Sequence, residues 1–426
     1  MTTERPTVAF ITLGCKVNQY DSDAMRAVLD YGGMRVCDDR EKADVYIINT
    51  CAVTAEAERK SRQAVGRILK LDPDAEIYVC GCASQNNFSQ FARDGVKFIS
   101  GTKGKLALAE ELVKKYCGEY DGFFDKIVAA DFDTARKYEE FKGTLTMRTR
   151  HFVKVQDGCN NFCSYCIVPY LRGRSRSRSV SGVLREIETA ETTAREIVLT
   201  GINLSAYGKD IGTSLADLLV TLQNCSARLR LGSLEVGVTD QAFLEAAKGV
   251  KAFCPHFHLS LQSGDDGVLK NMNRHYTAEE YFEKTELIRK YFPGAAITTD
   301  VIVGYPTETE SAFENSLEFC KRVRFADMHV FPYSSRKGTV AGKLPVLPPD
   351  VVSERLAAMM ELKRELSTEY RLQQLGKSVQ VLFETKEDGL WCGHTPNYVK
   401  VYSMAGERNL LLDVVPTALY GDGVRV

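Results

Sequence analysis

The chain has 426 residues, of which 44% are hydrophobic and 26% are charged, and its 55 basic and 56 acidic side chains leave a net charge of −1. This length is too great for one ordinary hydrophobic core, so we expect two or three domains, and the balanced charge excludes a chain that is strongly basic or acidic throughout. No apolar segment is long enough for a membrane span and no signal peptide is recognisable, which predicts a cytoplasmic protein with no membrane partner. The 13 cysteines are therefore expected as reduced thiols or metal ligands and not as disulfides.

The first part of the chain alternates β-rich runs with helical patterns. Because strand and helix alternate, we expect a doubly wound parallel sheet with helices on its faces. This pattern defines a predicted N-terminal domain at residues 1–120. The predicted strands are residues 7–14, 44–50 and 76–81.

A cysteine stands at the end of each of these runs. Cys15, Cys51 and Cys82 come one or two residues after the strand-like segments. The carboxyl ends of parallel strands meet along one edge of a sheet and form binding sites there, so we expect the three thiols on one rim. Cys80 lies inside the third run and is the alternative to Cys82 as a ligand.

A second series of strands and helices begins near residue 145. Its strand–helix units predict a partial (β/α)6 barrel, in a domain that we place at residues 145–375, with its chemistry at the carboxyl ends of the strands. The predicted strands are residues 152–156, 196–201, 228–235, 256–262, 296–304 and 327–334. The polar residues at or near their ends are Cys159, Asn203, Glu235, Gln262, Asp300 and Ser334.

The last part of the chain changes in composition. A proline-rich stretch at 343–350 precedes a long charged helical pattern that ends at Gly376. Residues 377–426 then consist of β-rich runs broken by Gly and Pro, which predicts a small all-β barrel or sandwich. The predicted fold class is thus α/β, with this small all-β domain placed at residues 376–426.

Three cysteines lie on one tight loop after the first strand of the barrel. Cys159, Cys163 and Cys166 have the spacing Cys-x3-Cys-x2-Cys, with Phe162 and Tyr165 beside the last two. Soft thiolates select zinc, copper(I) or iron–sulfur clusters. A four-iron cluster on three cysteines leaves one iron open to a small molecule. A zinc loop with a remote fourth ligand and a group of unrelated buried cysteines are the alternatives.

These motifs together resemble one enzyme family. The segment "CNNFCSYC" resembles the signature of the radical S-adenosylmethionine (SAM) enzymes. The segments "TLGCKVNQYDSD", "INTCAVTAEAERKSRQ" and "VCGCASQ" resemble the amino-terminal domain of the methylthiotransferases, and the carboxyl-terminal part resembles their TRAM domain. The resemblance covers essentially the whole chain, which is identified as a member of the radical SAM methylthiotransferase family.

The resemblance implies two [4Fe–4S] clusters and SAM as cofactors. The radical SAM cluster would be held by Cys159, Cys163 and Cys166, and the auxiliary cluster by the trio of the first domain. Two SAM molecules would be used, one as methyl donor and one as the source of a 5′-deoxyadenosyl radical. No catalytic residue is assigned beyond the two clusters. A reducing electron donor such as flavodoxin or ferredoxin is an implied partner.

The family has branches that differ in substrate. The motif Gly14–Gln19 resembles the branch that transfers a methylthio group to C2 of N6-threonylcarbamoyladenosine at position 37 of tRNA, in the anticodon stem-loop. The alternatives are isopentenyladenosine in tRNA and an aspartate of a ribosomal protein. A non-catalytic zinc-dependent RNA-binding protein is the alternative from another class.

The resemblance also implies residues near SAM. Glu235 would accept from the ammonium of SAM, or else be a solvated charge at a strand end, and Asp300 would lie near cofactor and substrate, or else cap the following loop. The full expected set is Tyr165, Arg178, Gly201, Asn203, Glu235, Gln262 and Asp300.

Four arginines follow the cysteine loop at every second position. If the segment is extended, Arg172, Arg174, Arg176 and Arg178 share one face and attract the phosphates of tRNA. We expect the first three as RNA contacts, with a solvated loop as the alternative. The carboxyl-terminal domain would grip the RNA stem, or would use the same residues for packing. These residues are Trp391, Tyr398, Lys400 and Tyr402.

Overall fold

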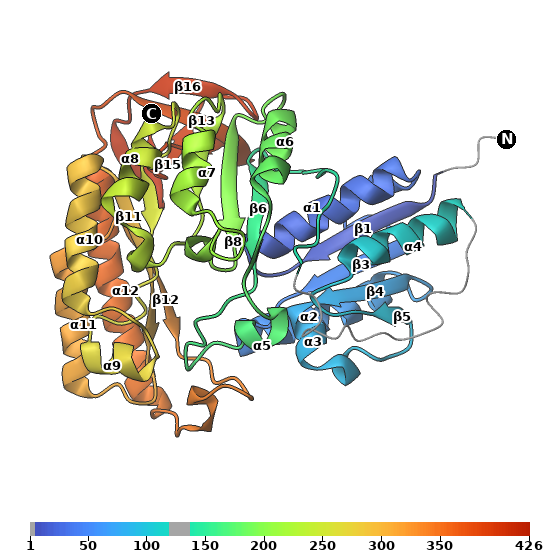
Figure 1. The fold of residues 1–426 in the computed structure, drawn as a ribbon, viewed down its shortest axis with the longest axis horizontal. Helices are drawn as coiled ribbons and strands as arrows, with labels where there is room; N and C mark the ends of the chain where they lie inside the picture. Colours follow the sequence, from blue (N-terminus) through green and yellow to red (C-terminus); the bar gives the residue numbers. More distant parts are fainter. Residues whose placement is uncertain (1–4, 119–136) are drawn as a thin grey trace.

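The computed structural model describes residues 5–118 and 137–426, so the predicted domain boundary at residue 120 lies outside the described residues. Figure 1 shows an N-terminal sheet on the right, a curved sheet with outer helices in the middle and on the left, and a C-terminal sheet at the top. The predicted α/β fold class is confirmed. Among the described residues, no helix has the length and apolar character needed to cross a membrane.

The N-terminal sheet is parallel and has the strand order β2-β1-β3-β4-β5. Its side chains alternate between two helical layers, because Val8 and Phe10 pack with α1 and α4 while Ala9 and Ile11 pack with α2. The strands are β1 (Thr7–Thr12), β2 (Arg35–Cys37), β3 (Val45–Thr50), β4 (Glu76–Gly81) and β5 (Val96–Ile99). The helices are α1 (Lys16–Tyr31), α2 (Ala55–Leu71), α3 (Cys82–Asn86) and α4 (Lys105–Cys117).

The central domain is a partial barrel of parallel strands. Strands β6, β8 and β9 are neighbours in one sheet, and β10, β11 and β12 form a second sheet. Two parallel bridges, from Leu229 to Phe253 and from Leu234 to Leu259, join the two sheets into one curved layer. The strands are β6 (His151–Asp157), β8 (Glu196–Gly201), β9 (Arg228–Leu231), β10 (His256–His258), β11 (Ala296–Val303) and β12 (Asp327–Pro332). A short β7 (Arg176–Ser177) pairs antiparallel with β6.

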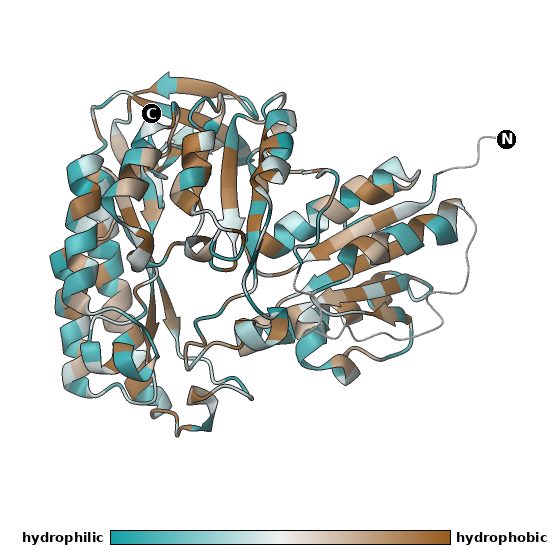
Figure 2. Ribbon diagram, in the orientation of Figure 1, coloured by the Kyte–Doolittle hydropathy of each residue, from teal (hydrophilic) through white to brown (hydrophobic). Residues whose placement is uncertain are grey.

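Helices cover the outside of the barrel. Figure 2 shows their apolar residues mixed with hydrophilic ones, as expected for helices with one buried face, while the strands are mainly apolar. They are α6 (Val180–Ala190), α7 (Leu215–Thr221), α8 (Gln241–Gly249), α9 (Asp266–Asn271), α10 (Ala278–Tyr291), α11 (Glu310–Val323) and α12 (Pro349–Leu372). The short α5 (Val168–Arg172) instead packs against α3 of the N-terminal domain (Figure 1).

The C-terminal sheet has the order β16-β13-β14-β15-β18-β17. Its pairs are antiparallel except β15 with β18, which are parallel. The strands are β13 (Val379–Glu387), β14 (Leu390–His394), β15 (Lys400–Ser403), β16 (Leu411–Val414), β17 (Ala418–Tyr420) and β18 (Gly423–Arg425). The expectation of a small all-β unit after the long helix agrees with this arrangement.

The C-terminal domain is held at the amino ends of the barrel strands. Glu196, at the start of β8, is fully buried between Arg228 and Arg230, and the Nε atom of Arg230 lies 2.7 Å from Glu196 Oε1. Arg230 also donates to the backbone oxygens of Thr395 at 3.1 Å and Pro396 at 2.9 Å. A buried charge cluster therefore ties the loop after β14 to the barrel.

Candidate active site

The three predicted cysteines of the N-terminal domain come together at one edge of its sheet. Cys15 caps the start of α1, Cys51 directly follows β3, and Cys82 begins α3. Burial raises the pKa of Cys51 to about 12, and the charges of Cys82 and Cys15 add to the rise, so the thiols lie within electrostatic reach of one another. A Cβ atom at Gly14 would lie 2.6 Å from the Cys51 sulfur, so glycine is needed for this close approach.

Polar side chains hold the loops that carry these thiols. Asn18 Nδ2 donates to the backbone oxygens of Leu13 at 2.8 Å and Thr50 at 2.9 Å. Thr50 Oγ1 donates to the backbone oxygen of Cys80 at 2.7 Å and accepts from the amide of Ala83 at 3.2 Å. The cysteine-bearing ends of β1, β3 and β4 are thus tied to one another.

Cys80 occupies a different environment from Cys82. It lies inside β4 and is fully buried in the apolar cluster between the sheet and α1 and α4. Burial raises the pKa of Cys80 to about 12. In contrast, the charges that raise the pKa of Cys51 include those of Cys82 and Cys15. The geometry therefore favours Cys82 as the third ligand.

The second cysteine trio lies on the loop after β6. The amide of Cys166 donates to the backbone oxygen of Cys163 at 2.9 Å, which closes a tight turn. Burial raises the pKa of Cys166 to about 12, and the charges of Cys163 and Cys159 add to the rise. In residues 5–118 and 137–426, no three Cys, His, Asp or Glu side chains already surround a point where a metal ion could be held.

The sulfur atoms of this loop receive hydrogen bonds from the barrel. Asn203 Nδ2 lies 3.8 Å from Cys159 Sγ and 3.3 Å from Glu235 Oε2. Asn203 Oδ1 is buried and has no hydrogen-bond partner, so an acceptor without a donor points into this site. Thiolates that accept hydrogen bonds, beside a free polar acceptor, fit a [4Fe–4S] cluster with SAM on it.

Arg274 was part of the motif "MNRHY" but was assigned no role from the sequence. Its Nη1 atom lies 3.4 Å from Cys163 Sγ and 3.2 Å from Glu235 Oε1, and Asn161 also donates to Glu235. Glu235 is therefore not a solvated charge at a strand end. It is held between the cysteine loop and the barrel.

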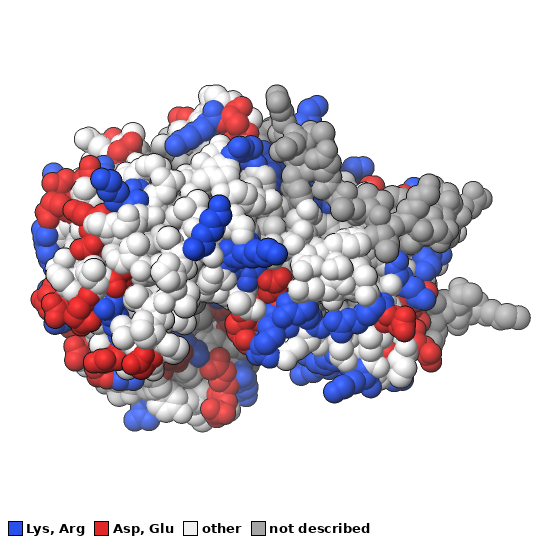
Figure 3. Space-filling model, turned by 90° about the horizontal axis from the view of Figure 1, so that it is seen from below, with Lys and Arg blue, Asp and Glu red and all other residues white. Residues whose placement is uncertain are grey.

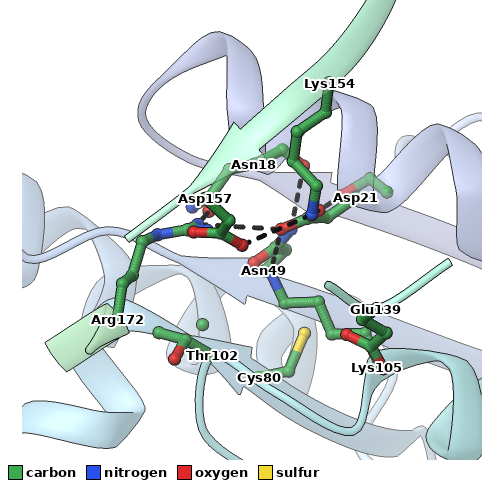
Figure 4. Close-up of polar contacts among 12 residues, drawn as sticks. Asn18, Asp21, Asn49, Cys80, Thr102, Lys105, Glu139, Lys154, Asp157 and Arg172 are labelled. Atoms are coloured by element: carbon green, nitrogen blue, oxygen red, sulfur yellow. Dashed lines mark hydrogen bonds and ion pairs between the residues drawn. The ribbon is translucent and has the colours of Figure 1, made fainter. Parts of the chain in front are cut away.

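A buried ion pair joins Arg172 to Asp157 (Figure 4). Arg172 Nη1 lies 3.0 Å from Asp157 Oδ1, and Nη2 lies 2.5 Å from Asn18 Oδ1, so Arg172 bridges the two domains. Burial raises the pKa of Cys82, and the positive charge of Arg172 opposes that rise. Asp157 stands two residues before Cys159. One guanidinium group thus contacts the surroundings of both trios.

The same network continues into the N-terminal domain. Asp21 is buried, and its carboxylate lies 2.5 Å from Lys105 Nζ, 2.5 Å from Lys154 Nζ and 3.6 Å from Arg172 Nη2. Figure 4 shows these side chains converging from α1, α4 and β6. The residues missed from the sequence are Asn18, Asp157 and Arg274. Asn18 lies inside a quoted motif, but nothing in its spacing reveals its partners.

The prediction that the four arginines share one face is wrong. The segment is not extended throughout, because α5 ends at Arg172 and Gly173 adopts a φ of +76°. Arg172 and Arg176 are buried and both pair with Asp157, at 3.0 Å and 3.3 Å. Their expected role as phosphate contacts is therefore wrong as well. Arg174 is the exposed member of the set.

The partners of Arg178 also differ from expectation. Its guanidinium group is buried, lies 2.5 Å from Glu140 Oε1, and donates to Glu186. Burial favours its neutral form, but Tyr20, Glu140 and Glu186 raise its pKa. We expected Arg178 to contact SAM, and the structure instead commits its donors to these carboxylates at the contact of α1 with α6.

Two further predicted SAM residues lie close to the cysteine loop. Burial raises the pKa of Tyr165, and the charge of Cys163 adds to the rise, so this ring is adjacent to the loop thiols. A Cβ atom at Gly201 would lie 2.9 Å from Gln156 Oε1, which itself accepts from the amide of Asn203 at 2.8 Å. Gly201 therefore lets the chain pass close enough to orient Asn203.

The last two, Gln262 and Asp300, lie in the other half of the barrel, where Gln262 forms an isolated bridge with Val301 of β11. Gln262 has a φ of +74° and its backbone bonds to Asp300 and Ile302 of β11, at 2.8 and 2.9 Å. Asp300 was expected at a strand end but lies inside β11, where its Oδ2 atom is 3.3 Å from His258 Nε2. It does not cap the following loop.

A cavity of 1070 Å³ occupies the interior of the partial barrel. Its walls include Cys15 and Lys16 of the N-terminal domain, Asp300 of β11 and Tyr398 of the C-terminal domain. Residue Ser233, two positions before Glu235, also lines it. The walls of the cavity therefore come from all three domains, with Cys15 among them. We call it the barrel cavity.

The aromatic residues expected to grip RNA serve other contacts. The ring of Tyr398 stacks between His256 and His394, with centroid distances of 4.8 and 4.7 Å. Tyr402 donates to Asp422, and Lys400 lies 2.8 Å from Glu387. These residues pack within the domain or line the barrel cavity, which is the alternative that the sequence left open.

Family models match two segments of the chain. Residues 153–320 match the radical SAM superfamily. Residues 7–101 match a family described as uncharacterized protein family UPF0004. Among solved structures, the radical SAM methyltransferase TsrM from Kitasatospora setae has a TM-score of 0.59 at 15% identity, and the match covers 79% of this chain and 77% of that chain. The fold and the cysteine loop define a radical SAM enzyme that uses SAM and [4Fe–4S] clusters.

Curated relatives show which family of radical SAM enzymes the chain resembles. Threonylcarbamoyladenosine tRNA methylthiotransferase MtaB from Bacillus subtilis is 36% identical, over 93% of this chain and 90% of its own length. MtaB from Aquifex aeolicus is 36% identical over 92% and 96%. A tRNA-2-methylthio-N(6)-dimethylallyladenosine synthase from Pseudothermotoga lettingae is 34% identical over 96% and 95%. The chain belongs to the radical SAM methylthiotransferase family.

Proposed function

We propose that the protein transfers a methylthio group to C2 of N6-threonylcarbamoyladenosine in tRNA. The observation that carries the proposal is the position of Cys15, which belongs to one cysteine trio and lines a cavity whose walls come from all three domains. A nucleotide in this barrel cavity would meet groups from both domains. The relatives named MtaB support the choice of tRNA and of this nucleotide.

The six cysteines are proposed as ligands of two clusters, Cys15, Cys51 and Cys82 for the auxiliary cluster and Cys159, Cys163 and Cys166 for the radical SAM cluster. When bound, SAM and the two clusters supply the 5′-deoxyadenosyl radical, the methyl group and the sulfur of a C–H methylthiolation that acid–base chemistry cannot perform. The electrons would come from a reducing protein such as flavodoxin or ferredoxin.

The chain's own polar groups would orient SAM. Glu235 carries a negative charge beside the cysteine loop and can accept from the ammonium of SAM. Asn203 has a buried oxygen without a donor, which offers a second acceptor. Arg274 balances the charge of Glu235 and donates to Cys163 Sγ, so it would fix both the carboxylate and the thiolate.

Approach of RNA would use the exposed basic side chains. Figure 3 shows Lys and Arg side chains gathered over the middle and right of one face, where the N-terminal domain lies, and Asp and Glu more frequent at the left margin. Arg174 is exposed beside the cysteine loop, with its guanidinium 4.5 Å from the centre of the Phe162 ring. Such a side chain can contact phosphate or stack with a base.

The test is an anaerobic assay with reconstituted enzyme, SAM and a reductant. Total tRNA and ribosomes are offered in separate reactions, and nucleosides and ribosomal proteins are analysed by mass spectrometry. The proposal expects the methylthio group on N6-threonylcarbamoyladenosine. A methylthio group on a ribosomal-protein aspartate, or on isopentenyladenosine alone, would contradict it.

A further inference from the structure

One lysine of the barrel cavity is in no ion pair with the described residues. Lys16 is the first residue of α1, directly after Cys15, and its exposed side chain lines the cavity. Its ammonium group forms no hydrogen bond or ion pair with any residue of the described ranges. An ammonium group that lines a cavity and is bound to no carboxylate can bind an anionic ligand.

The other basic residues of the cavity wall are already engaged. Five of them pair with carboxylates, and the sixth, Arg371, donates to backbone oxygens of Ser367 and Gly421. Burial also lowers the pKa of His256 and of His329, which favours the neutral form of these cavity histidines. The paired set is Arg150, Arg230, Lys363, Arg364 and Lys400.

The position of Lys16 in the cavity follows from its electrostatic neighbours. Burial opposes the ionisation of Asp300, but the hydrogen bond from His258 and the charges of His258, His329 and Lys16 lower its pKa. The same lysine charge acts on His256. Lys16 therefore lines the same cavity as His256 of β10 and Asp300 of β11, beside Cys15 at the edge of the N-terminal domain.

The proposed substrate carries a negative charge that the ammonium group of Lys16 could bind. The threonylcarbamoyl group on N6 ends in a carboxylate, whereas a dimethylallyl group has no charge. C2 and C6 of adenine flank the same ring nitrogen, so a residue that meets the N6 substituent must lie near the groups that act on C2. Lys16 satisfies this condition because it is bonded to Cys15.

We infer that Lys16 binds the carboxylate of the threonylcarbamoyl group and is a specificity-determining residue. This inference rests on the proposed function. The alternative source of an anion is a phosphate of the RNA backbone, which every RNA carries whatever its modification. A contact with the threonylcarbamoyl carboxylate would make the affinity for RNA depend on that carboxylate, whereas a contact with a backbone phosphate would not.

The experiment compares holoenzyme variants in binding to anticodon stem-loop RNAs. One RNA carries N6-threonylcarbamoyladenosine, a second carries its carboxamide analogue, and a third carries unmodified adenosine. Wild-type enzyme is expected to bind the carboxylate RNA about tenfold more tightly than the carboxamide RNA, as for one charge-assisted hydrogen bond. Lys16→Gln should remove this preference, and Lys16→Arg should keep most of it.

Lys363→Gln is the matched control, because this lysine lines the same cavity but is paired with Asp327 at 3.5 Å. It should keep the preference. Iron content is measured for every variant, since Lys16 adjoins a proposed ligand. If Lys16→Gln loses iron, the inference is tested on wild-type enzyme alone, by comparing its affinities for the carboxylate RNA and the carboxamide RNA. Equal affinities for these two RNAs would overturn the inference.

Two other results would also overturn it. Lys16→Gln could keep the wild-type preference, or it could weaken all three RNAs equally, as a phosphate contact would. Failure of the proposed function is distinguishable, because wild-type enzyme would then fail to methylthiolate the threonylcarbamoyl RNA. A wild-type enzyme that modifies this RNA while Lys16→Gln still discriminates would refute the inference alone.

Discussion

Arg172 and Asp157 form an ion pair of 3.0 Å between two buried side chains, at the place where the N-terminal domain meets the barrel. Arg172 also binds Asn18 of α1, and its charge acts on Cys82. The pair therefore joins the segment that leads into the radical SAM loop to the rim that carries the other cysteines. It is one of the contacts that hold the two trios in their relative positions, together with the ion pair of Lys154 with Asp21.

Replacement of Arg172 is expected to destabilise the protein strongly. Arg172→Gln leaves Asp157 and Asp21 with less positive charge in a buried site, which costs about 3–5 kcal/mol of unfolding free energy. Urea unfolding of the metal-free protein measures the loss. Arg174→Gln is the control, because this exposed arginine has no carboxylate partner to leave behind and should change the free energy by about 0.5 kcal/mol or less. Equal urea midpoints for wild type and Arg172→Gln would contradict the account.

The buried carboxylate of Asp21 predicts a dependence of stability on pH. Burial would raise its pKa, but Lys105, Lys154 and Arg172 lower it from 3.8 to about 2. Because the folded pKa is the lower one, the stabilisation is fully present above the unfolded pKa and is lost as the pH falls towards 2. The loss is about 2 kcal/mol.

Urea midpoints of the metal-free protein between neutral and acidic pH test this assignment. Asp21→Asn should be less stable at neutral pH and should lose less stability on acidification than wild type. Asp30→Asn is the control on the same helix, since this residue is exposed and pairs with exposed Arg5. Parallel pH curves for wild type and Asp21→Asn would show that Asp21 is not the group responsible.

Cluster loading tests the two cysteine trios separately. Wild-type enzyme reconstituted anaerobically should hold about eight irons, as two cubane clusters require. Cys51→Ala and Cys159→Ala should each lose about half of them. Cys80→Ala is the control, because this thiol lies inside β4 and should leave iron binding unchanged. If Cys80→Ala lost iron while Cys82→Ala kept all of it, the third ligand of the first trio would be Cys80 and not Cys82.

Arg174 is expected to account for most of the RNA binding that the sequence attributed to the arginine repeat. Arg174→Gln should weaken binding of tRNA and reduce the slope of log affinity against log salt by about one, as the loss of one phosphate contact requires. Arg185→Gln is the matched control on the exposed side of α6. If binding and salt dependence are unchanged, Arg174 contacts no phosphate.

The sequence predicted the architecture because the periodic patterns are local. The strand at residues 196–201 was predicted with the bounds that β8 has, since five of its six side chains are buried and form one continuous run. The short edge strand β2 was missed because it has three residues and none is fully buried. β10 ends at His258 and not at residue 262, because beyond His258 only isolated bridges, at Leu259 and at Gln262 with its positive φ, still pair the chain with neighbouring strands.

The cysteine trios were predictable from strand ends, but the arginines were not. Period-two spacing indicates one face only if the backbone is extended, and the turn at Gly173 breaks that condition. Whether Arg172 faces solvent or Asp157 depends on a partner 15 residues away in the chain and on a second domain. Such partners leave no local pattern. The same reason explains why Arg274 could be noticed as part of a motif without its contact to Cys163 being foreseen.

The central claim is that this enzyme places the methylthio group on N6-threonylcarbamoyladenosine of tRNA. The most direct test is mass spectrometry of tRNA nucleosides from a strain in which the gene is deleted, and from the same strain with the gene restored. The account predicts that the methylthio derivative of N6-threonylcarbamoyladenosine disappears on deletion, that unmodified N6-threonylcarbamoyladenosine accumulates, and that both changes reverse on restoration. Persistence of the methylthio derivative in the deletion strain, with loss of methylthio-isopentenyladenosine in its place, would contradict it.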